Sequence, residues 1–254
     1  MAITAILLNW NRAFNLKHII LPLLSRHPLI NEIIISHGKS SSMFDYESPH
    51  CKIVHRDDVD NNEKYGLSLR FLALSSAKND QVLILDDDLF VFSESISRLS
   101  QYYLTDPMII HGLFGRTVNN KYQYHYTNWL YGYVPIVLTK CMILNKCYGE
   151  LFLERAVMMK DILNKGDPYW NGEDIFMSLL MVDRMGRLPC AYKLPYVNLS
   201  YSEFYGISSK WRGFFNKKPM DTLPHEIYRK LFTQTCIERL ELQPIMNSWL
   251  GNFL

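Results

Sequence analysis

Residues 81–92 read QVLILDDDLFVF, in which three aspartates stand between two runs of apolar residues. The first run, 81–85, has the length and composition of a buried β-strand. Carboxylates are costly beside a buried segment unless they bind a partner. Their place at the end of a strand therefore favours a functional site over a solvated acidic turn.

Strand-like and helix-like segments alternate ahead of this stretch. Residues 2–9 (AITAILLN) and 30–38 (INEIIISHG) are typical of strands, and residues 15–27 (NLKHIILPLLSRH) and 65–77 (YGLSLRFLALSSA) are typical of helices. Short apolar strands separated by helices predict βαβ units with right-handed crossovers. The expected fold class is α/β, with a mostly parallel central sheet flanked by helices.

The second half has a different texture. Residues 115–135 are irregular and rich in aromatic side chains, whereas 171–186 and 224–242 are typical of helices. We find no repeat, low-complexity segment or linker, so one domain over 1–254 is expected. A ligand site is expected outside the carboxyl ends of the strands, where NWNR (9–12), SHGKSSS (36–42) and the Asp triplet lie.

Composition excludes several classes of protein. With 254 residues, 48% of them hydrophobic, the chain can form a packed core and is not disordered. Lys and Arg total 27 against 25 for Asp and Glu, which gives no sign of a nucleic-acid partner. Five cysteines without CxxC spacing suggest neither zinc nor a disulfide framework. Since no signal peptide or transmembrane segment is evident, a soluble protein of the cytoplasm is expected.

The Asp triplet has the chemistry of a divalent-cation site. Carboxylates at a strand end can hold Mn²⁺ or Mg²⁺ and leave positions open for a substrate phosphate. If the strand continues through the triplet, Asp86 and Asp88 share one face and Asp87 points away. Metal-dependent nucleotide-sugar transferases use such a stretch, and so do haloacid-dehalogenase-type phosphatases, in which Asp86 would be the nucleophile. The phosphatase motif normally opens its domain, so the transferase is favoured here.

The chain resembles the exostosin-like retaining glycosyltransferases, the family of the heparan-sulfate polymerase C-terminal domain. The resemblance covers roughly residues 3–245 and rests on NWNR (9–12), SLRF (68–71), LDDD (85–88) and NGEDIFMSLL (171–180), in that order. It implies a GT-A fold, a UDP-sugar donor, Mn²⁺ and retention at the anomeric carbon. It also implies a nucleotide-binding half over 1–106, an acceptor-binding half over 107–254, and a glycan or glycoprotein acceptor.

The resemblance also assigns roles to individual residues. It makes Asp88 the chief metal ligand with Asp86 beside it, and Asp174 the catalytic-site aspartate. Donor-binding roles fall to seven positions: Asn11, Arg12, Arg70, Asp86, Asp87, Asn171 and Glu173. Arg12 is expected to pair with the diphosphate.

The sequence departs from the family pattern in two places. Gly172 stands where secretory relatives carry a cysteine, so Cys236 lacks that disulfide partner, which agrees with a reducing compartment. Thr233 replaces a family arginine; Arg229, one helical turn earlier, or Arg212 could supply the charge instead.

The aromatic stretch suggests an acceptor site. Carbohydrate sites combine aromatic platforms with polar groups, and the candidates here are Tyr122, Tyr124, Tyr126, Trp129 and Tyr131. A noncatalytic carbohydrate-binding protein is therefore a second alternative. The sequence does not distinguish UDP-N-acetylglucosamine from UDP-xylose or UDP-glucose as donor, and it does not predict the oligomeric state.

Overall fold

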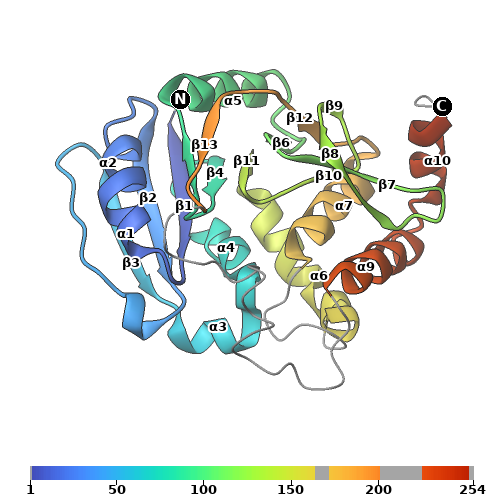
Figure 1. The fold of residues 1–254 in the computed structure, drawn as a ribbon, viewed down its shortest axis with the longest axis horizontal. Coiled ribbons are helices and arrows are strands. Elements are labelled where there is room, and N and C mark those ends of the chain that lie inside the picture. Colours follow the sequence, from blue (N-terminus) through green and yellow to red (C-terminus); the bar gives the residue numbers. More distant parts are fainter. Residues whose placement is uncertain (1, 164–171, 201–224, 252–254) are drawn as a thin grey trace.

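A computed structural model of the chain describes residues 2–163, 172–200 and 225–251. Its main sheet has eight strands in the order β3-β2-β1-β4-β11-β6-β12-β9, and it includes strands from both halves of the chain (Figure 1). The strands are β1 (Ile3–Asn9), β2 (Ile30–His37), β3 (Lys52–Asp57), β4 (Gln81–Leu85), β6 (His111–Gly112), β9 (Gly132–Tyr133), β11 (Cys141–Asn145) and β12 (Cys190–Ala191).

Parallel pairing dominates this sheet. The pairs β1–β2, β2–β3, β1–β4 and β6–β12 are parallel, and β11 enters antiparallel between β4 and β6. The predicted α/β class with a mostly parallel central sheet is confirmed. Two small antiparallel sheets complete the strands: β7 (Gly115–Val118) lies between β10 (Ile136–Val137) and β8 (Tyr124–Leu130), and β5 (Leu89–Val91) pairs with β13 (Tyr196–Asn198).

Helices lie on both faces of the sheet, since each of the two core clusters contains residues of helices as well as of strands (Figure 1). The α-helices are α1 (Ala13–Asn15), α2 (Leu21–Leu24), α3 (Val59–Tyr65), α4 (Leu69–Leu72), α5 (Ser93–Thr105), α6 (Cys147–Leu163), α7 (Glu173–Met185), α9 (His225–Arg239) and α10 (Gln243–Gly251). A π-helical turn, η1 (Leu16–Ile20), joins α1 to α2. The 3-10 turns are η2 (Ser40–Ser42) after β2, and η3 (Gly66–Ser68) and η4 (Leu74–Ser76) on either side of α4. None of the helices in the described ranges combines the length and apolarity needed to cross a membrane.

The helix predicted over 15–27 forms with one irregularity. The helical run over 13–24 widens into the π turn η1 immediately before α2, whose first turn contains Pro22. Proline has no N–H to donate, and its ring clashes with the carbonyl four residues earlier in a regular α-helix. The π turn includes His18, the residue whose carbonyl would meet the Pro22 ring in a regular α-helix.

The Asp triplet lies in a turn, which corrects one prediction. Strand β4 ends at Leu85, and β5 begins at Leu89. The alternation of side chains that was expected to pair Asp86 with Asp88 therefore does not apply, because it holds only for extended backbone. The turn sends the three carboxylates toward different partners.

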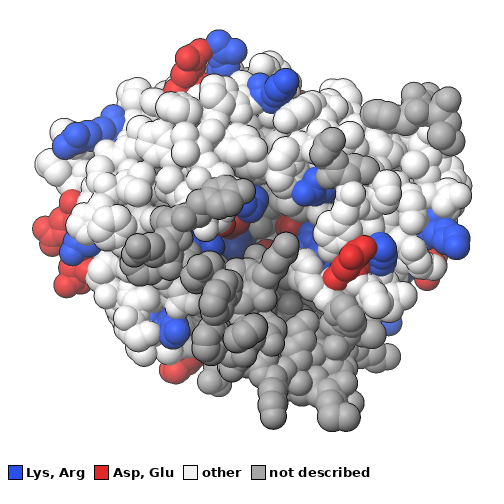
Figure 2. Space-filling model, in the orientation of Figure 1, with Lys and Arg blue, Asp and Glu red and all other residues white. Residues whose placement is uncertain are grey.

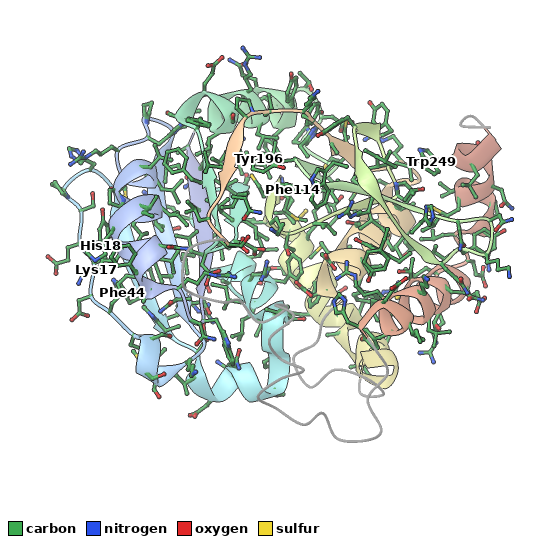
Figure 3. All side chains as sticks on the ribbon, viewed as in Figure 1. Lys17, His18, Phe44, Phe114, Tyr196 and Trp249 are labelled. Carbon is green, nitrogen blue, oxygen red and sulfur yellow. The ribbon has the colours of Figure 1, made fainter. Side chains whose placement is uncertain are left out.

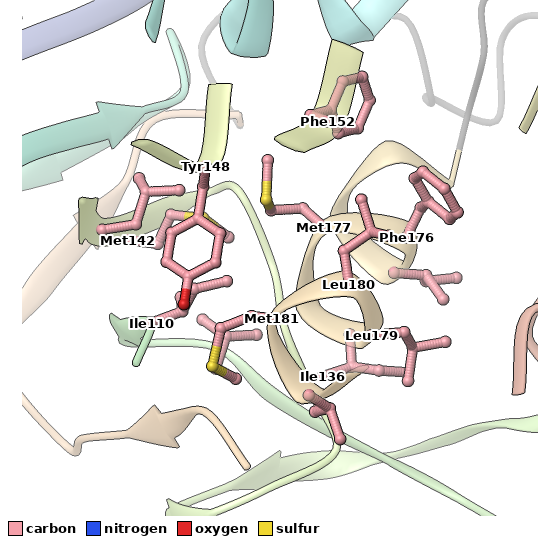
Figure 4. Close-up of a cluster of buried hydrophobic side chains, with 14 of the residues drawn as sticks. Ile110, Ile136, Met142, Tyr148, Phe152, Phe176, Met177, Leu179, Leu180 and Met181 are labelled. Carbon is pink, nitrogen blue, oxygen red and sulfur yellow. The ribbon is translucent and has the colours of Figure 1, made fainter. Parts of the chain in front are cut away.

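Helix α7 is buried along most of its length, and this places its first turn. Every residue from Glu173 to Val182 is buried. Figure 4 shows Met181 beside Tyr148 of α6, and both residues belong to one core cluster with Leu180 and with Met142 of β11. A helix that is apolar on all sides belongs in a core. Its acidic first residues are thereby held at the end of the core that faces the carboxyl ends of β1 and β4.

The opposite face of the sheet has a second core cluster. Leu83, Leu85 and Ile143 belong to it, with Phe114 at the centre of the aromatic contacts. The Phe114 ring lies 4.9 Å from that of Tyr196 and 4.8 Å from that of Trp129, both edge-on. Figure 3 shows Phe114 and Tyr196 side by side, where β13 crosses the sheet.

Candidate functional site

A cavity of about 300 Å³ opens at the carboxyl ends of β1 and β4. It is lined by the end of NWNR, the Asp triplet, the first turn of α7 and residues of β7, β8 and α9. Its acidic members are Asp86, Asp87, Asp88, Glu173 and Asp174, and its Lys and Arg members are Arg12, Arg70, Arg116, Lys140 and Arg229. Figure 2 shows red and blue atoms together in a hollow near the centre of this face.

Two arginines hold the first two aspartates of the triplet. Arg70 Nη1 lies 2.7 Å from Asp86 Oδ1, and its Nε lies 4.0 Å from Glu173 Oε1. Arg12 Nη1 lies 2.7 Å from Asp87 Oδ1. Both arginine side chains are more than nine-tenths buried. The two family-assigned arginines are thus fixed at the site by the carboxylates themselves.

Asp88 lies between two cations. Arg12 Nη1 is 3.4 Å from its Oδ2, and Lys140 Nζ is 3.6 Å from its Oδ1. The second distance is that of an ion pair and is too long for a hydrogen bond. Asp88 Oδ1 is buried and has no hydrogen-bond partner. Lys140 was not predicted, because it reaches the site through the pairing of β11 with β4, two strands that are far apart in the sequence.

The triplet fits a divalent cation that has few protein ligands. A buried carboxylate oxygen without a hydrogen bond is uncommon and suits a metal. The described residues contain no cluster of three or more His, Cys, Asp or Glu side chains that could hold a metal ion. Asp88 Oδ1 matches the sparse coordination of Mg²⁺-type ions, whose other ligands are water and substrate phosphates. The resemblance assigns Asp86 as the second carboxylate, and the structure pairs that side chain with Arg70.

Burial changes the acidity of the triplet. Desolvation, only partly offset by Arg12, raises the pKa of Asp87 to about 6. Desolvation and the negative charge of Asp86 also raise the pKa of Asp88, despite Lys140 and Arg12. A cation bound at these carboxylates would favour their ionised forms.

Across the cavity, Asp174 and Arg229 form a buried ion pair. Arg229 Nη2 lies 3.0 Å from Asp174 Oδ2 and 3.1 Å from Oδ1. The guanidinium carbon also lies 4.5 Å from the ring centre of Tyr124. Burial alone would lower the pKa of Arg229, but Asp174 and Tyr124 raise it, so Arg229 stays protonated at any working pH.

Glu173 is enclosed beside this pair. Its carboxylate accepts hydrogen bonds from the Gly172 N–H (3.1 Å) and the Thr139 hydroxyl (3.4 Å). Desolvation and the neighbouring Asp174 raise its pKa to about 7, although Arg70 opposes the shift. The hydrogen bond from the Gly172 N–H connects the Glu173 carboxylate to the start of α7.

The structure explains the departures at Gly172 and Thr233. Gly172 has φ +139°, and a Cβ there would lie 2.8 Å from the Phe232 ring. All five cysteines are free, and Cys236 is buried. The Thr233 hydroxyl donates to the Arg229 carbonyl at 2.7 Å. Arg229 reaches Asp174 from one turn before Thr233, as the sequence allowed.

Three of the five candidate aromatics line the cavity. They are Tyr124, Tyr126 and Trp129, joined by Arg116, which stacks on Trp129 with its guanidinium carbon 3.7 Å from the ring centre. Arg116 Nε also donates to the Tyr124 hydroxyl at 3.1 Å. The remaining two lie elsewhere: the Tyr122 hydroxyl donates to Asn247, and Tyr131 is exposed outside the cavity.

The NWNR segment forms the rim of the cavity. Trp10 and Asn11 line it, and Lys39 Nζ donates to Asn11 Oδ1 at 3.2 Å. Asn15, which was not predicted, donates to the Asp87 carbonyl at 3.2 Å and steadies the turn. Asn171 and Arg212 lie outside the described residues.

A family model described as the glycosyl transferase family 64 domain matches residues 3–239. The chain is 31% identical over 124 residues to the Arabidopsis thaliana protein named "Glycosyltransferase family protein 64 C3". That match covers 47% of this chain and 37% of the relative, so the chain accounts for well under half of the relative's length.

The fold also has solved neighbours. One is S. aureus TarS 1-349 in complex with UDP, with a TM-score of 0.49 and 12% identity over 77% of this chain and 60% of that one. Another is a putative glucose-1-phosphate thymidylyltransferase from Bacillus anthracis in complex with a sucrose, with a TM-score of 0.48 and 12% identity over 78% of this chain and 89% of that one.

Proposed function

The chain belongs to glycosyl transferase family 64, and on that premise we propose that it is an exostosin-like, metal-dependent retaining glycosyltransferase. It moves a sugar from a UDP-sugar to a hydroxyl group of a glycan or glycoprotein. The observation that carries the proposal is the arrangement of two charged groups on one cavity. The Asp triplet with its cations forms one wall, and the Asp174–Arg229 pair faces the same space.

The wall that contains the triplet suits a diphosphate. Five carboxylates and five Lys or Arg side chains line the cavity, so its bare charge is close to neutral. A nucleoside diphosphate adds negative charge, which calls for a further cation. Mn²⁺ or Mg²⁺ held by Asp88 and Asp86 would supply that charge and stabilise the departing diphosphate. Arg12 and Arg70 provide buried, fixed positive charge beside it.

Asp174 acts on the sugar. The bond between the anomeric carbon and the diphosphate oxygen breaks, its electron pair leaves with UDP, and the acceptor oxygen bonds to that carbon. The carbon is positive in the transition state, and the Asp174 carboxylate stabilises it. Two routes retain the configuration. In the first, Asp174 displaces UDP to form an ester with the anomeric carbon, and the acceptor oxygen then displaces Asp174 while the bound UDP phosphate takes the acceptor proton. In the second, the acceptor attacks from the face that UDP leaves, and the leaving phosphate takes the acceptor proton.

The ion pair favours the same-face route. A carboxylate whose two oxygens both face Arg229 Nη2, at 3.0 and 3.1 Å, is a weaker nucleophile than a bare one. The aromatic side of the cavity, with Tyr126 and Trp129, is then the place for the acceptor sugar. Mass spectrometry of protein mixed with donor tests the choice, because only the double displacement gives a glycosylated Asp174.

The phosphatase alternative has less support. Its nucleophile would be Asp86, but Oδ1 of that side chain is 2.7 Å from Arg70 Nη1, and an ion-paired carboxylate is a weaker nucleophile than a free one. Family membership also favours transfer over noncatalytic glycan binding. The free cysteines agree with a reducing compartment, which we propose is the cytoplasm.

A screen of UDP-sugars with purified protein tests the proposal. UDP release is measured with Mn²⁺, Mg²⁺ or chelator, using UDP-N-acetylglucosamine, UDP-glucose and UDP-xylose. At least one donor is expected to release UDP in a metal-stimulated reaction that is lost in Asp88→Ala and Asp174→Ala. Full activity in both variants would contradict the proposal.

A further inference from the structure

Lys140 belongs to the cation set of the site, and no sequence motif marks it. Its ammonium lies 3.6 Å from Asp88 Oδ1 and 5.7 Å from the centre of the Phe114 ring. The ammonium group therefore lies near both the carboxylate and the ring. Lys140 thus stands at the oxygen that best fits a divalent cation.

Strand pairing fixes this position. Strand β11 pairs antiparallel with β4, with Cys141 opposite Leu85. The next residues along this register are Lys140 and Asp86, and the Asp86 N–H donates to the Lys140 carbonyl at 3.0 Å. The backbone of Lys140 is therefore attached to the triplet, and only its side chain can change direction.

Lys140 is also better able to turn than Arg12, Arg70 and Arg229. Its side chain is 28% exposed, compared with 9%, 6% and 8% for Arg12, Arg70 and Arg229. Its 3.6 Å ion pair is longer than the closest contacts of those three, which are 2.7 to 3.0 Å. Leaving Asp88 costs it less than the same movement would cost a buried arginine.

We propose that Lys140 is a donor-binding residue that neutralises Asp88 in the empty site and turns to the donor diphosphate when the nucleotide binds. Lys140 then supplies part of the positive charge that a divalent cation otherwise provides, and it opposes cation binding to Asp88 before the donor arrives. The inference rests on the proposed function, since it needs a diphosphate ligand. Its consequence is nucleotide binding that depends only partly on metal.

Calorimetry with UDP tests this directly. The dissociation constant is measured in Mn²⁺ and in chelator for wild type, Lys140→Met and Lys140→Arg. Lys140→Met is expected to weaken UDP binding in chelator by about tenfold and to weaken it much less in Mn²⁺. The ratio of the two constants therefore rises, and Lys140→Arg keeps it near the wild-type value because the charge is retained.

A matched control is available on the same strand. Lys146 pairs with Asp80 at 3.2 Å at the other end of β11, outside the cavity, so Lys146→Met is expected to leave the ratio unchanged. If Lys140→Met also leaves it unchanged while UDP binds, Lys140 does not contact the diphosphate and the inference fails alone. If wild type does not bind UDP in either buffer, the proposed function fails and the inference with it. Circular dichroism confirms that each variant is folded.

Discussion

Arg229 and Asp174 form a buried ion pair that ties helix α9 to the first turn of α7, with Nη2 3.0 Å from Oδ2. Both side chains are about nine-tenths buried. The pair fixes the carboxylate of the proposed sugar site and leaves its orientation dependent on a helix 55 residues further along the chain.

Breaking this pair from either side is expected to destabilise the fold. Arg229→Met leaves the Asp174 charge buried without its partner, which costs about 3 kcal/mol of unfolding free energy. Asp174→Asn leaves the Arg229 charge buried without its partner in the same way. The double variant is expected to lose less than the sum of the single losses, as measured by urea unfolding. Strict additivity would show that the two side chains do not interact in solution.

Stability is expected to depend on pH through Glu173. Its pKa in the folded protein is about 7, above the ordinary 4.5, so the folded state binds the proton more tightly than the unfolded state does. The resulting stability is complete below pH 4.5 and is lost as pH rises through 7. Between about pH 5 and about pH 8, the free energy of unfolding should fall by on the order of 2 kcal/mol more in wild type than in Glu173→Gln. Parallel stability curves for the two proteins would contradict the assignment.

Gly172 is expected to tolerate no side chain. Gly172→Ala combines a φ of +139° with a Cβ only 2.8 Å from the Phe232 ring. The substitution should cost about 2 kcal/mol and lower the melting temperature. Gly186→Ala is the matched control, since Gly186 also has positive φ (+63°) but has nothing within 4 Å of its added Cβ. Gly186→Ala should lower the free energy of unfolding by less than Gly172→Ala does. An equal decrease in the two variants would rule out the Phe232 contact as the cause.

Trp129 is expected to contact the acceptor sugar. Trp129→Ala removes the ring on which Arg116 stacks. The KM for the acceptor should rise about tenfold, while the KM for the donor changes little. Tyr131→Ala, in the same aromatic stretch but outside the cavity, should leave both constants unchanged. A rise confined to the donor KM in Trp129→Ala would place the ring on the other side of the cavity.

Much of the framework could be predicted from the sequence. Strands β1, β2 and β4 are short runs of buried residues, and α7 and α9 have helical periodicity, so local patterns are sufficient. Strand β3 was not predicted, because all six of its residues are exposed or half-buried and so show no alternation of buried and exposed side chains. Helix α3 was missed because it is polar.

The site was predicted only in part, for a similar reason. The triplet and Asp174 stand in motifs, and the structure brings them to one cavity. The prediction that Asp86 and Asp88 lie on one face of a strand is wrong, because the strand ends at Leu85. Lys140 and Arg116 occur in no motif. They reach the cavity through the pairing of β11 with β4 and the stacking of Arg116 on Trp129, which sequence spacing does not encode.

The central claim is that the triplet binds the diphosphate of a nucleotide with the help of a divalent cation at Asp88. It is tested most directly by titrating UDP into wild type and Asp88→Asn in the presence of Mn²⁺, with circular dichroism as the check on folding. We expect wild type to bind UDP and Asp88→Asn to bind it at least about tenfold more weakly. Equal affinities in the two proteins, or no binding to wild type, would contradict it.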